Sequence, residues 1–333
     1  MKENSFVSVI IPCRNEKDYI KKCLESLLKQ DYPKENLEIL VVDGMSEDGT
    51  KGIVEKYALE HPSLDIRIKD NENKIKSSAL NIWIPKSKGD FIAIADAHTE
   101  YQKNYISKAV NYLKEYNTDA VGGIIKIPSL QHTKLKARAI AISLSSFFGA
   151  ASFFRRGTEK PQYVDTVFNG CYKREVFNKI GLFNENLVRS QDLEFNLRLK
   201  KAGGKILLVP DIVFIYYPKP NLKDFFAHNL EDGIWAIYPL KFTKTFFRLR
   251  HYLPLFFILA ALILIIASFF SLIFLYSLAT LILLYLLTNI LSSILITIKE
   301  KDFRYFFLMP FIFAVRHFGY GLGSLWGLIK LAL

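Results

Sequence analysis

The chain of 333 residues has few cysteines, and one long stretch of it has no charge. Its three cysteines, Cys13, Cys23 and Cys171, are too widely spaced to form a metal-ligand pattern or a disulfide framework. We therefore expect them to be small buried apolar residues of a protein in a reducing compartment.

The N-terminus lacks a long apolar run. Its first 13 residues read MKENSFVSVIIPC, in which the apolar segment is short and contains Pro12. This pattern is not that of a secretory signal peptide, so we expect the N-terminal part of the chain to stay in the cytosol.

No charged residue occurs in residues 252–298, whereas residues 1–250 mix charged and apolar residues as soluble proteins do. One membrane-spanning helix needs only about 20 apolar residues. We therefore predict two spans, at about 253–272 and 275–298, that form a tight hairpin. A fully buried helix of a soluble protein is the alternative, but soluble helices of this length carry polar faces.

The chain also lacks an aromatic and basic pattern typical of nucleic-acid binding, although its formal net charge is +12. Basic residues instead flank the uncharged stretch: Lys241, Lys244, Arg248, Arg250, Lys299, Lys301 and Arg304. Positive residues at the ends of spans are typical of the cytoplasmic side and of contact with anionic lipid. We therefore predict a multi-pass protein of the cell membrane whose N-terminal domain is cytoplasmic, with no nucleic-acid partner.

The last segment, residues 303–333, is hydrophobic but carries Arg316 and His317 near its middle. It forms either a third span or two short interfacial pieces broken at Pro310 or at the glycines that follow. Charged residues at such depth are costly, so Arg316 either meets a lipid phosphate or is a snorkelling or helix-paired residue.

The N-terminal part alternates between two kinds of pattern. Apolar and β-branched runs predict strands at 6–11, 37–43, 64–68, 91–96 and 120–127. Apolar residues at helical spacing predict helices at about 20–28, 48–60, 74–84 and 103–116. This alternation favours an α/β fold with a mostly parallel sheet and helices on both faces.

Polar residues follow three of these strands. Pro12 to Glu16 follow the first strand, Asp43 ends the second, and Asp96 to His98 follow the fourth. One aspartate at a strand end is usually a turn residue or a helix cap. Several acids at one edge repel each other unless a cation or a donor-rich ligand lies there. Because ligands of such sheets bind beyond the carboxyl ends of the strands, we predict a ligand site at this edge.

Four segments together resemble a family 2 glycosyltransferase with a GT-A fold. They are VSVIIPCRNE (7–16), EILVVDGMSEDGT (38–50), SSALNIWIPKSKGDFIAIADAH (77–98) and NGCYKREVFNKIGLFNENLVRSQDLEFNLRLKKAGGKI (169–206). The chain is similar to the succinoglycan-biosynthesis type in DAH, in FFRRGTEKPQYVDTVFNGCY (153–172) and in its hydrophobic C-terminus. The resemblance implies a Rossmann-like GT-A catalytic domain over residues 1–240. A juxtamembrane segment and two to three transmembrane or interfacial helices would follow over 241–333.

The resemblance also implies a divalent cation, Mn²⁺ or Mg²⁺, beside the diphosphate of a nucleotide sugar, which we expect to be a UDP-sugar. Asp96 begins the metal motif, usually Asp-X-Asp, but His98 stands at its third position. His98 either binds the cation or is a hydrogen-bonding loop residue. A carboxylate with an imidazole suits Mn²⁺ somewhat better than Mg²⁺.

The residues that the resemblance places around the donor nucleotide are Pro12, Arg14, Glu16, Asp43, Lys74, Asn81 and Asp96. Lys76 is an alternative to Lys74. Ser46 or Asp48 fits the cap of the following helix instead.

Direct displacement at an anomeric carbon needs a carboxylate that takes the proton of the acceptor hydroxyl. The resemblance assigns this role to Asp192, which with Gln191 stands where the family has Glu-Asp, and it puts Gln191 and Trp235 on the acceptor side. The alternative for Asp192 is the N-cap of a helix that runs to Lys201. We therefore expect an inverting enzyme of exopolysaccharide or glycan assembly. It would move one sugar to a lipid-linked saccharide or polyprenyl acceptor at the cytoplasmic membrane face.

Two other functions stay open. A non-catalytic, membrane-anchored nucleotide-sugar-binding scaffold would not need both Asp96 and Asp192. A processive polysaccharide synthase would carry a Gln-X-X-Arg-Trp string, whereas the comparable region here reads HNLEDGIWAIYP (228–239), in which Trp235 is present without the Gln and Arg.

Overall fold

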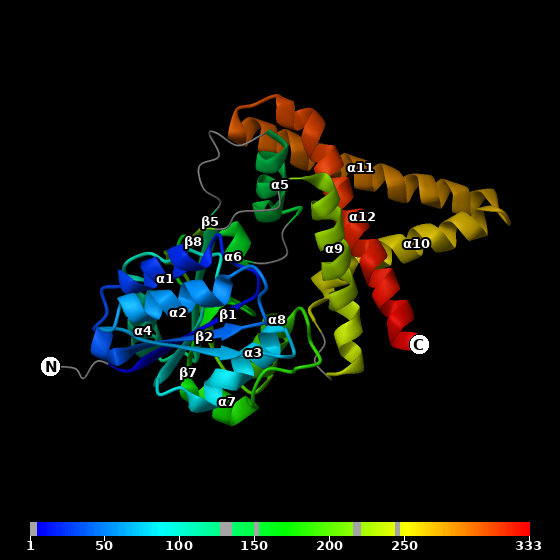
Figure 1. Ribbon diagram of the computed structural model, residues 1–333. Coiled ribbons are helices and arrows are strands. Elements are labelled where there is room, and N and C mark those ends of the chain that lie inside the picture. Colours follow the sequence, from blue (N-terminus) through cyan, green and yellow to red (C-terminus); the bar gives the residue numbers. More distant parts are fainter. Residues whose placement is uncertain (1–4, 127–134, 150–152, 216–220, 244–246) are drawn as a thin grey trace. The chain divides into compact units, whose positions relative to one another are not determined.

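The protein is described by a computed structural model that covers residues 5–126, 135–149, 153–215, 221–243 and 247–333 (Figure 1). These residues form two compact units. The first unit contains the described residues up to 126 and residues 153–215. The second contains residues 135–149 and the described residues from 221 onward.

The first unit is built on an eight-stranded sheet of order β3-β2-β1-β4-β7-β5-β8-β6. The strands are β1 (Val7–Cys13), β2 (Leu37–Asp43), β3 (Asp65–Asp70), β4 (Phe91–Ile94), β5 (Ala120–Lys126), β6 (Gln162–Tyr163), β7 (Phe168–Lys173) and β8 (Ile206–Ile215). Strands β1 to β4 pair in parallel, as do β5 and β8. Strand β7 runs antiparallel between β4 and β5, and β6 runs antiparallel at the edge.

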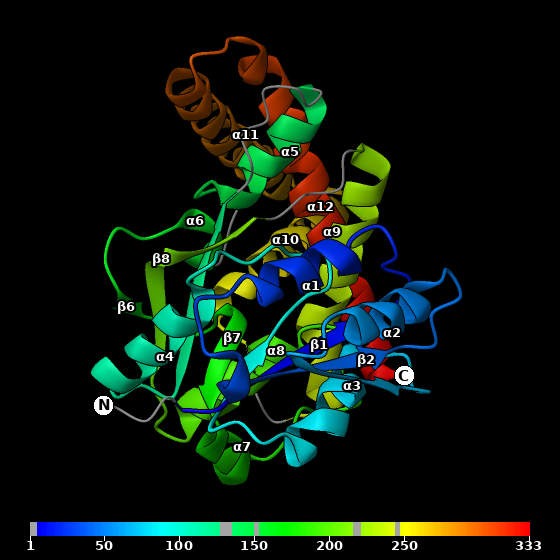
Figure 2. The ribbon, with the colours of Figure 1, turned by 60° about the vertical axis from the view of Figure 1, so that its left-hand side comes forward.

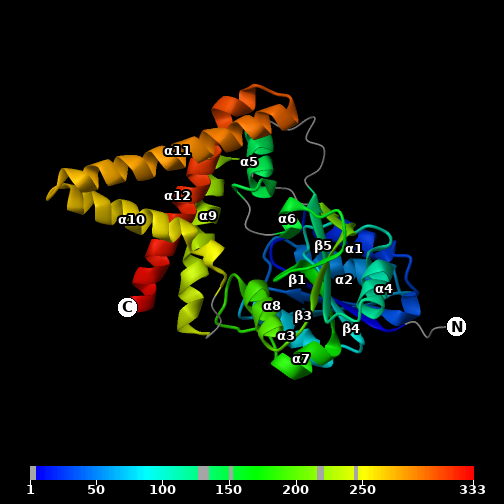
Figure 3. The same ribbon diagram turned by 180° about the vertical axis from the view of Figure 1, so that it is seen from behind.

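Helices cover both faces of this sheet (Figures 2 and 3). One face carries α1 (Ile20–Leu28), α2 (Thr50–Glu60) and α4 (Tyr105–Glu115). The other carries α3 (Lys76–Trp83), α7 (Arg174–Ile180) and α8 (Gln191–Lys201). All seven residues of β2 are buried because helices lie on both sides, as is typical of parallel strands. The short elements are α6 (Phe153–Arg156), η1 (Lys34–Asn36) and η2 (Ile84–Lys86).

The five predicted strands and the mostly parallel sheet are confirmed, with differences in detail. Pro12 lies inside β1 rather than after it, beyond the part of β1 that pairs with β4, so its missing N–H costs no ladder bond there. Residue 127, the last of the predicted fifth strand, lies outside the described residues. Strands β6, β7 and β8 were not predicted, and the six residues of β7 include the turn-like pair Asn169-Gly170. The three cysteines are buried and unpaired, as expected.

The second unit is helical. It contains α5 (Leu135–Ser145), α9 (Leu222–Ile237), α10 (Leu253–Ser268), α11 (Leu272–Glu300) and α12 (Arg304–Ala332), with the short helices η3 (Tyr238–Lys241) and η4 (Leu249–His251). Helices α11 and α12 are long and apolar enough to cross a membrane, and α10 is a shorter apolar helix.

The predicted helical hairpin corresponds to α10 and α11, which are joined by residues 269–271 (Figure 1). Residues 304–332 form one helix that continues through Pro310, so the alternative of two separate pieces is wrong. Lys244, one of the basic residues before the hairpin, lies outside the described residues.

Helices α9 and α12 approach each other at glycines. A Cβ atom on Gly323 would lie 2.0 Å from the carbonyl oxygen of Leu230, and one on Gly233 would lie 2.0 Å from that of Tyr320. Gly319 and Gly327, each four residues from Gly323, also face α9. Such spacing of small residues lets two helix backbones come close. Residues 222–237 therefore pack within the second unit, while the functional boundary after residue 240 stays a prediction.

Arg316 and His317 are bound to protein groups within the second unit. Arg316 donates to the carbonyl oxygen of Gly149 and, over 3.0 Å, to Oδ1 of Asn229. Nε2 of His317 lies 3.0 Å from the carbonyl oxygen of Phe148. Of the two roles considered for Arg316, these contacts are those of a helix-paired residue.

The contact between α9 and α12 can be tested by Gly323→Leu. The new side chain would overlap the backbone of α9, and overpacking of this kind typically costs about 1–3 kcal/mol. We expect a clear fall in the thermal unfolding temperature of the detergent-solubilised protein.

Gly52→Ala is the matched control. Gly52 lies in α2, and a Cβ atom there would meet nothing within 4 Å. An alanine should therefore stabilise the helix slightly. An unfolding temperature that is unchanged by Gly323→Leu would show that α9 and α12 do not pack in this way.

Candidate functional site

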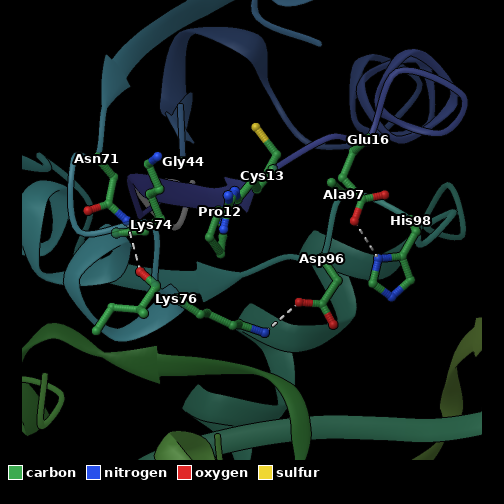
Figure 4. Close-up of a pocket in the computed structure, with 13 residues that line it drawn as sticks. Pro12, Cys13, Glu16, Gly44, Asn71, Lys74, Lys76, Asp96, Ala97 and His98 are labelled. Atoms are coloured by element: carbon green, nitrogen blue, oxygen red, sulfur yellow. Dashed lines mark hydrogen bonds and ion pairs between the residues drawn. The ribbon is translucent and has the colours of Figure 1, made fainter. Parts of the chain in front are cut away.

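A cavity of about 240 Å³ lies at the carboxyl ends of β1, β2 and β4 (Figure 4). We call it the outer cavity. It is lined by Pro12, Cys13, Arg14, Glu16, Gly44, Asn71, Lys74, Ile75, Lys76, Ala79, Asp96, Ala97 and His98. Its position is the one predicted from the strand ends.

The loops after β1 and β2 are tied together at the rim of this cavity. The N–H of Asn15 donates to Oγ of Ser46 over 2.9 Å, and the N–H of Glu16 donates to Oγ1 of Thr50 over 2.8 Å. Asn15 has φ 56°, a left-handed conformation that asparagine tolerates well. This geometry fixes the places of Arg14 and Glu16 on the cavity wall.

Asp43 is buried just behind this rim. Its Oδ2 accepts the N–H of Ser46 over 2.8 Å, so its observed role is to hold the turn after β2. Of the two cap candidates, Asp48 rather than Ser46 accepts the N–H of Thr50, the first residue of α2. Gly44 lines the cavity in place of Asp43, whose contact with a nucleoside stays a prediction.

Lys76 and Asp96 form an ion pair inside the outer cavity, with Nζ 2.5 Å from Oδ1 (Figure 4). Burial by itself lowers the pKa of Lys76, but Asp96 and Asp192 together raise that pKa above its ordinary value. The ammonium is therefore charged at neutral pH. Lys74 also lines the cavity, so both candidate lysines are at the site, and Lys76 is the one paired with Asp96.

His98 lies on the other side of Asp96, and its Nδ1 is 3.4 Å from Oε1 of Glu16 (Figure 4). The hydrogen bond with Glu16 raises the pKa of His98, against the opposite effect of burial. Pairing through Nδ1 leaves Nε2 for another partner, which is the arrangement found when a carboxylate orients a metal-binding histidine.

The fit to a divalent cation is that of a partial site. The described residues contain no group of three or more His, Cys, Asp and Glu side chains placed to hold a metal. The carboxylate of Glu16 is paired with His98, so the outer cavity offers a cation the carboxylate of Asp96 and one imidazole nitrogen of His98. This set suits a cation that takes its remaining ligands from phosphate oxygens and water.

A second and much smaller cavity, of about 10 Å³, shares Lys76 with the outer cavity. We call it the inner recess. It is lined by Lys76, Leu80, Ile94, Val167, Asn169, Gly170, Tyr172, Phe183, Gln191 and Asp192.

Asp192 lies in the first turn of α8, which begins after Ser190 rather than at Asp192. The alternative of an N-cap role for Asp192 is therefore wrong. Burial raises the pKa of the Asp192 carboxyl, although the charge of Lys76 works against this. A half-buried carboxylate with a raised pKa holds a proton more tightly than an exposed one, as a general base requires.

Besides Asp43, two residues of the predicted site line neither cavity. The amide of Asn81 donates to the carbonyl oxygen of Phe183 and to Oε1 of Glu185, both over 2.8 Å, and it accepts the N–H of Phe183. Trp235 belongs to α9 in the second unit, where its ring packs edge to face with that of Tyr238.

Sequence reasoning passed over two polar residues of these cavities. Asn71 directly follows β3 at the same edge of the sheet, and inspecting the end of the third strand would have found it. Asn169 lies in the quoted string NGCY, where an Asn-Gly pair within a strand-like run was the available signal.

Comparison with known proteins gives related sequences over the whole chain. Residues 8–181 match the family described as glycosyl transferase family 2. The dolichyl N-acetyl-alpha-D-glucosaminyl phosphate 3-beta-D-2,3-diacetamido-2,3-dideoxy-beta-D-glucuronosyltransferase of Methanococcus voltae is 32% identical over 333 aligned positions, which cover 98% of each chain. The succinoglycan biosynthesis protein ExoA of Rhizobium meliloti is 25% identical over 70% of this chain and 74% of that one.

A solved structure shares the fold. The mannosyltransferase PcManGT from Pyrobaculum calidifontis, in complex with GDP-Man and Mn²⁺, superposes with a TM-score of 0.63 at 20% identity. The superposition covers 98% of this chain and 88% of that one. The expected GT-A fold is thereby confirmed.

The different surroundings of Asn81 and Lys74 predict opposite effects of their removal. Asn81→Ala should lower the free energy of unfolding by about 1–3 kcal/mol, because it leaves groups of the 183–185 loop unpaired. Its affinity for a nucleoside diphosphate should stay as in the wild type. Lys74→Ala should weaken nucleotide binding several-fold at an unchanged unfolding temperature, because Lys74 is exposed at the cavity.

Thermal unfolding and titration with UDP and GDP measure the two effects. If Asn81→Ala binds nucleotide more weakly at a normal unfolding temperature, Asn81 contacts the donor nucleotide. That result would contradict the role of holding the 183–185 loop.

Proposed function

Because the chain belongs to glycosyl transferase family 2, we propose that it transfers one sugar from a UDP-sugar to a lipid-linked acceptor, with inversion at the anomeric carbon. The chain is an enzyme that acts on nucleotide sugars; the nucleotide base, the stereochemistry and the acceptor belong to the proposal. Transfer would take place at the cytoplasmic face of the membrane.

One observation carries the proposal: Lys76 stands between two carboxylates that face different cavities. Asp96 lies on the outer cavity and Asp192 on the inner recess, and both raise the pKa of Lys76. If the diphosphate of a donor lay beside Lys76, the anomeric carbon of its sugar would lie between the carboxylates of Asp96 and Asp192. A base on one side and a leaving group on the other is the arrangement that a direct displacement needs.

The outer cavity has the charges to hold a diphosphate. Arg14, Lys74 and Lys76 are its cationic side chains. Asp96, with His98 oriented by Glu16, would hold a divalent cation, Mn²⁺ or Mg²⁺. Such a cation, when bound, would offset the negative charge that gathers on the departing nucleoside diphosphate.

Asp192 is proposed to accept the proton of the acceptor hydroxyl as that oxygen attacks. Its raised pKa favours this role, and the positive charge of Lys76 opposes the effect of burial on that pKa. General base catalysis of this kind typically contributes about 10²–10⁴ to the rate.

The lipid-linked acceptor is supported by the relatives and by the apolar helices. The Methanococcus voltae relative acts, by its name, on a dolichyl-linked sugar phosphate, and the Rhizobium meliloti relative serves succinoglycan biosynthesis. Helices α11 and α12 are apolar enough to enter a bilayer. Anchoring the enzyme at the bilayer would raise the local concentration of a lipid-borne acceptor.

The deciding experiment uses the purified full-length protein in detergent. It is incubated with UDP- and GDP-sugars and with a polyprenyl-phosphate-linked N-acetylglucosamine, in Mn²⁺, in Mg²⁺ and in EDTA, and products are weighed by mass spectrometry. The proposal expects the mass of one added sugar, formed only with a divalent cation. Binding without product with every acceptor would favour the scaffold, and a ladder of masses would favour the processive synthase.

Asp192→Asn tests the base directly. Transfer should fall by about 10²–10⁴, whereas affinity for the nucleotide sugar should stay close to that of the wild type. Since the change removes a half-buried charge, the unfolding temperature should be equal or higher.

The matched control is Asp65→Asn, which changes an exposed acid of β3 that lines neither cavity and should leave transfer unchanged. Transfer by Asp192→Asn at a rate near that of the wild type would exclude the assigned base.

The pH dependence of transfer gives a second check. Asp192 can act only when deprotonated, so activity should fall as pH drops through its pKa, at a higher pH than for an ordinary aspartate. Lys76→Met removes the positive charge that lowers this pKa, so the acid limb of kcat should move to higher pH. A limb that moves to lower pH, or that stays in place, would contradict the coupling of Lys76 to Asp192.

A further inference from the structure

The inner recess is lined by Asn169 and Gln191, whose buried side-chain oxygens, Oδ1 and Oε1, have no hydrogen-bond partner among the described residues. The two residues are only 5% and 7% exposed. A buried polar atom left unpaired destabilises a protein, so two of them on residues that line one small recess indicate a site for a polar group.

Asn169 is held in place from behind. It lies within β7 at φ 46°, and its Nδ2 donates over 3.1 Å to Oη of Tyr101. The N–H of Asp96 donates to the same oxygen over 2.8 Å. Tyr101 thus links the backbone at Asp96 to the amide of a residue that lines the recess. Turning this amide over would exchange its two polar atoms and still leave one of them without a partner.

The size of the recess limits what can enter. Its volume of about 10 Å³ is that of roughly one water-sized sphere. Apart from Lys76 and Asp192, its remaining wall is largely apolar and includes Leu80, Val167 and Phe183. A hydroxyl group fits such a space, whereas an acetamido or carboxyl group does not.

The chemistry of the two amides matches a hydroxyl. A hydroxyl has one hydrogen to donate and two lone pairs to accept with. It can donate to one amide oxygen and accept an N–H from the other amide once that amide turns over. One hydroxyl therefore satisfies both Asn169 and Gln191.

We propose that the inner recess receives one free hydroxyl of the donor's sugar ring, held by Asn169 and Gln191, and that it excludes any larger substituent at that ring position. The inference rests on the proposed function. Lys76 lines both cavities, so a sugar attached to a diphosphate beside Lys76 reaches the recess directly. Asn169 and Gln191 thus set which donor sugars are accepted.

The experiment begins with the full-length wild type in detergent and measures the affinities of UDP, GDP and a panel of their sugars by calorimetry in Mn²⁺. The nucleotide sugar that binds most tightly is carried forward. If no nucleotide sugar binds, the proposed function falls and this inference falls with it, an outcome separate from those of the second stage.

The second stage uses analogues of that donor in which each ring hydroxyl in turn is replaced by hydrogen or fluorine. For the wild type, we expect one position to cost at least about tenfold in affinity, because its loss leaves both amides unpaired. The variants are Asn169→Gly, which tolerates the left-handed backbone, and Gln191→Met, which keeps the side-chain length. In both, the same replacement should cost less than about twofold.

Two controls separate recognition from structure. Gln30→Met removes a buried glutamine whose amide is fully paired, to Ser26, Gln102 and Ile106, and it lines neither cavity. It should lower the unfolding temperature and keep the wild-type preference among analogues. UDP or GDP without a sugar should bind to Asn169→Gly and Gln191→Met as to the wild type.

Three results would overturn the inference. The first is that each replacement lowers the affinity equally in the wild type and in both variants. The second is that the variants lose affinity for the sugar-free nucleotide as much as for the nucleotide sugar, which would show a structural role alone. The third is that the variants change the effect of deoxy analogues of the acceptor and not of the donor, which would assign the recess to the acceptor.

Discussion

The ion pair between Lys76 and Asp96 is the interaction on which the site depends. Asp96 follows a fully buried strand, and a carboxylate in such a place is stable only with a cation beside it. Lys76 is the first residue of α3 and lines both the outer cavity and the inner recess. The position at which α3 begins therefore determines where the two cavities adjoin. The positive charge of Lys76 also lowers the pKa of Asp192, against the larger effect of burial.

Features that arise from local patterns could be predicted from the sequence. Buried strands of unbroken apolar residues were placed to within a few residues, and the strand ends located the outer cavity. The roles of Asp43 and Asn81 could not be derived in this way. Asn81 is fixed by a loop 102 residues further along the chain, and only the folded chain reveals that pairing. The choice between Lys74 and Lys76 likewise depends on where α3 begins, and the sequence predicts that position only to within about one helical turn.

In the second unit, too, features of the local sequence could be predicted, whereas contacts between segments far apart in the chain could not. The absence of charge alone located α10 and α11. The pairing of α9 with α12 depends on which small residues of the two helices come into contact. Glycines at helical spacing indicate a close helix contact but do not show which helix is the partner. Residues 222–237 look like the end of a soluble domain when they are read alone, and their packing shows that α9 is stabilised by the apolar C-terminal helix.

The burial of the three cysteines has a practical consequence for spectroscopy. Burial raises the pKa of Cys13 and of Cys171 to about 12 and raises that of Cys23 as well. Thiols in this state form almost no thiolate at neutral pH and react slowly with maleimides or iodoacetamides. One cysteine introduced on the surface, for example at the rim of the outer cavity, is therefore the preferred target of a fluorophore or spin label. The native cysteines can stay in place during such labelling.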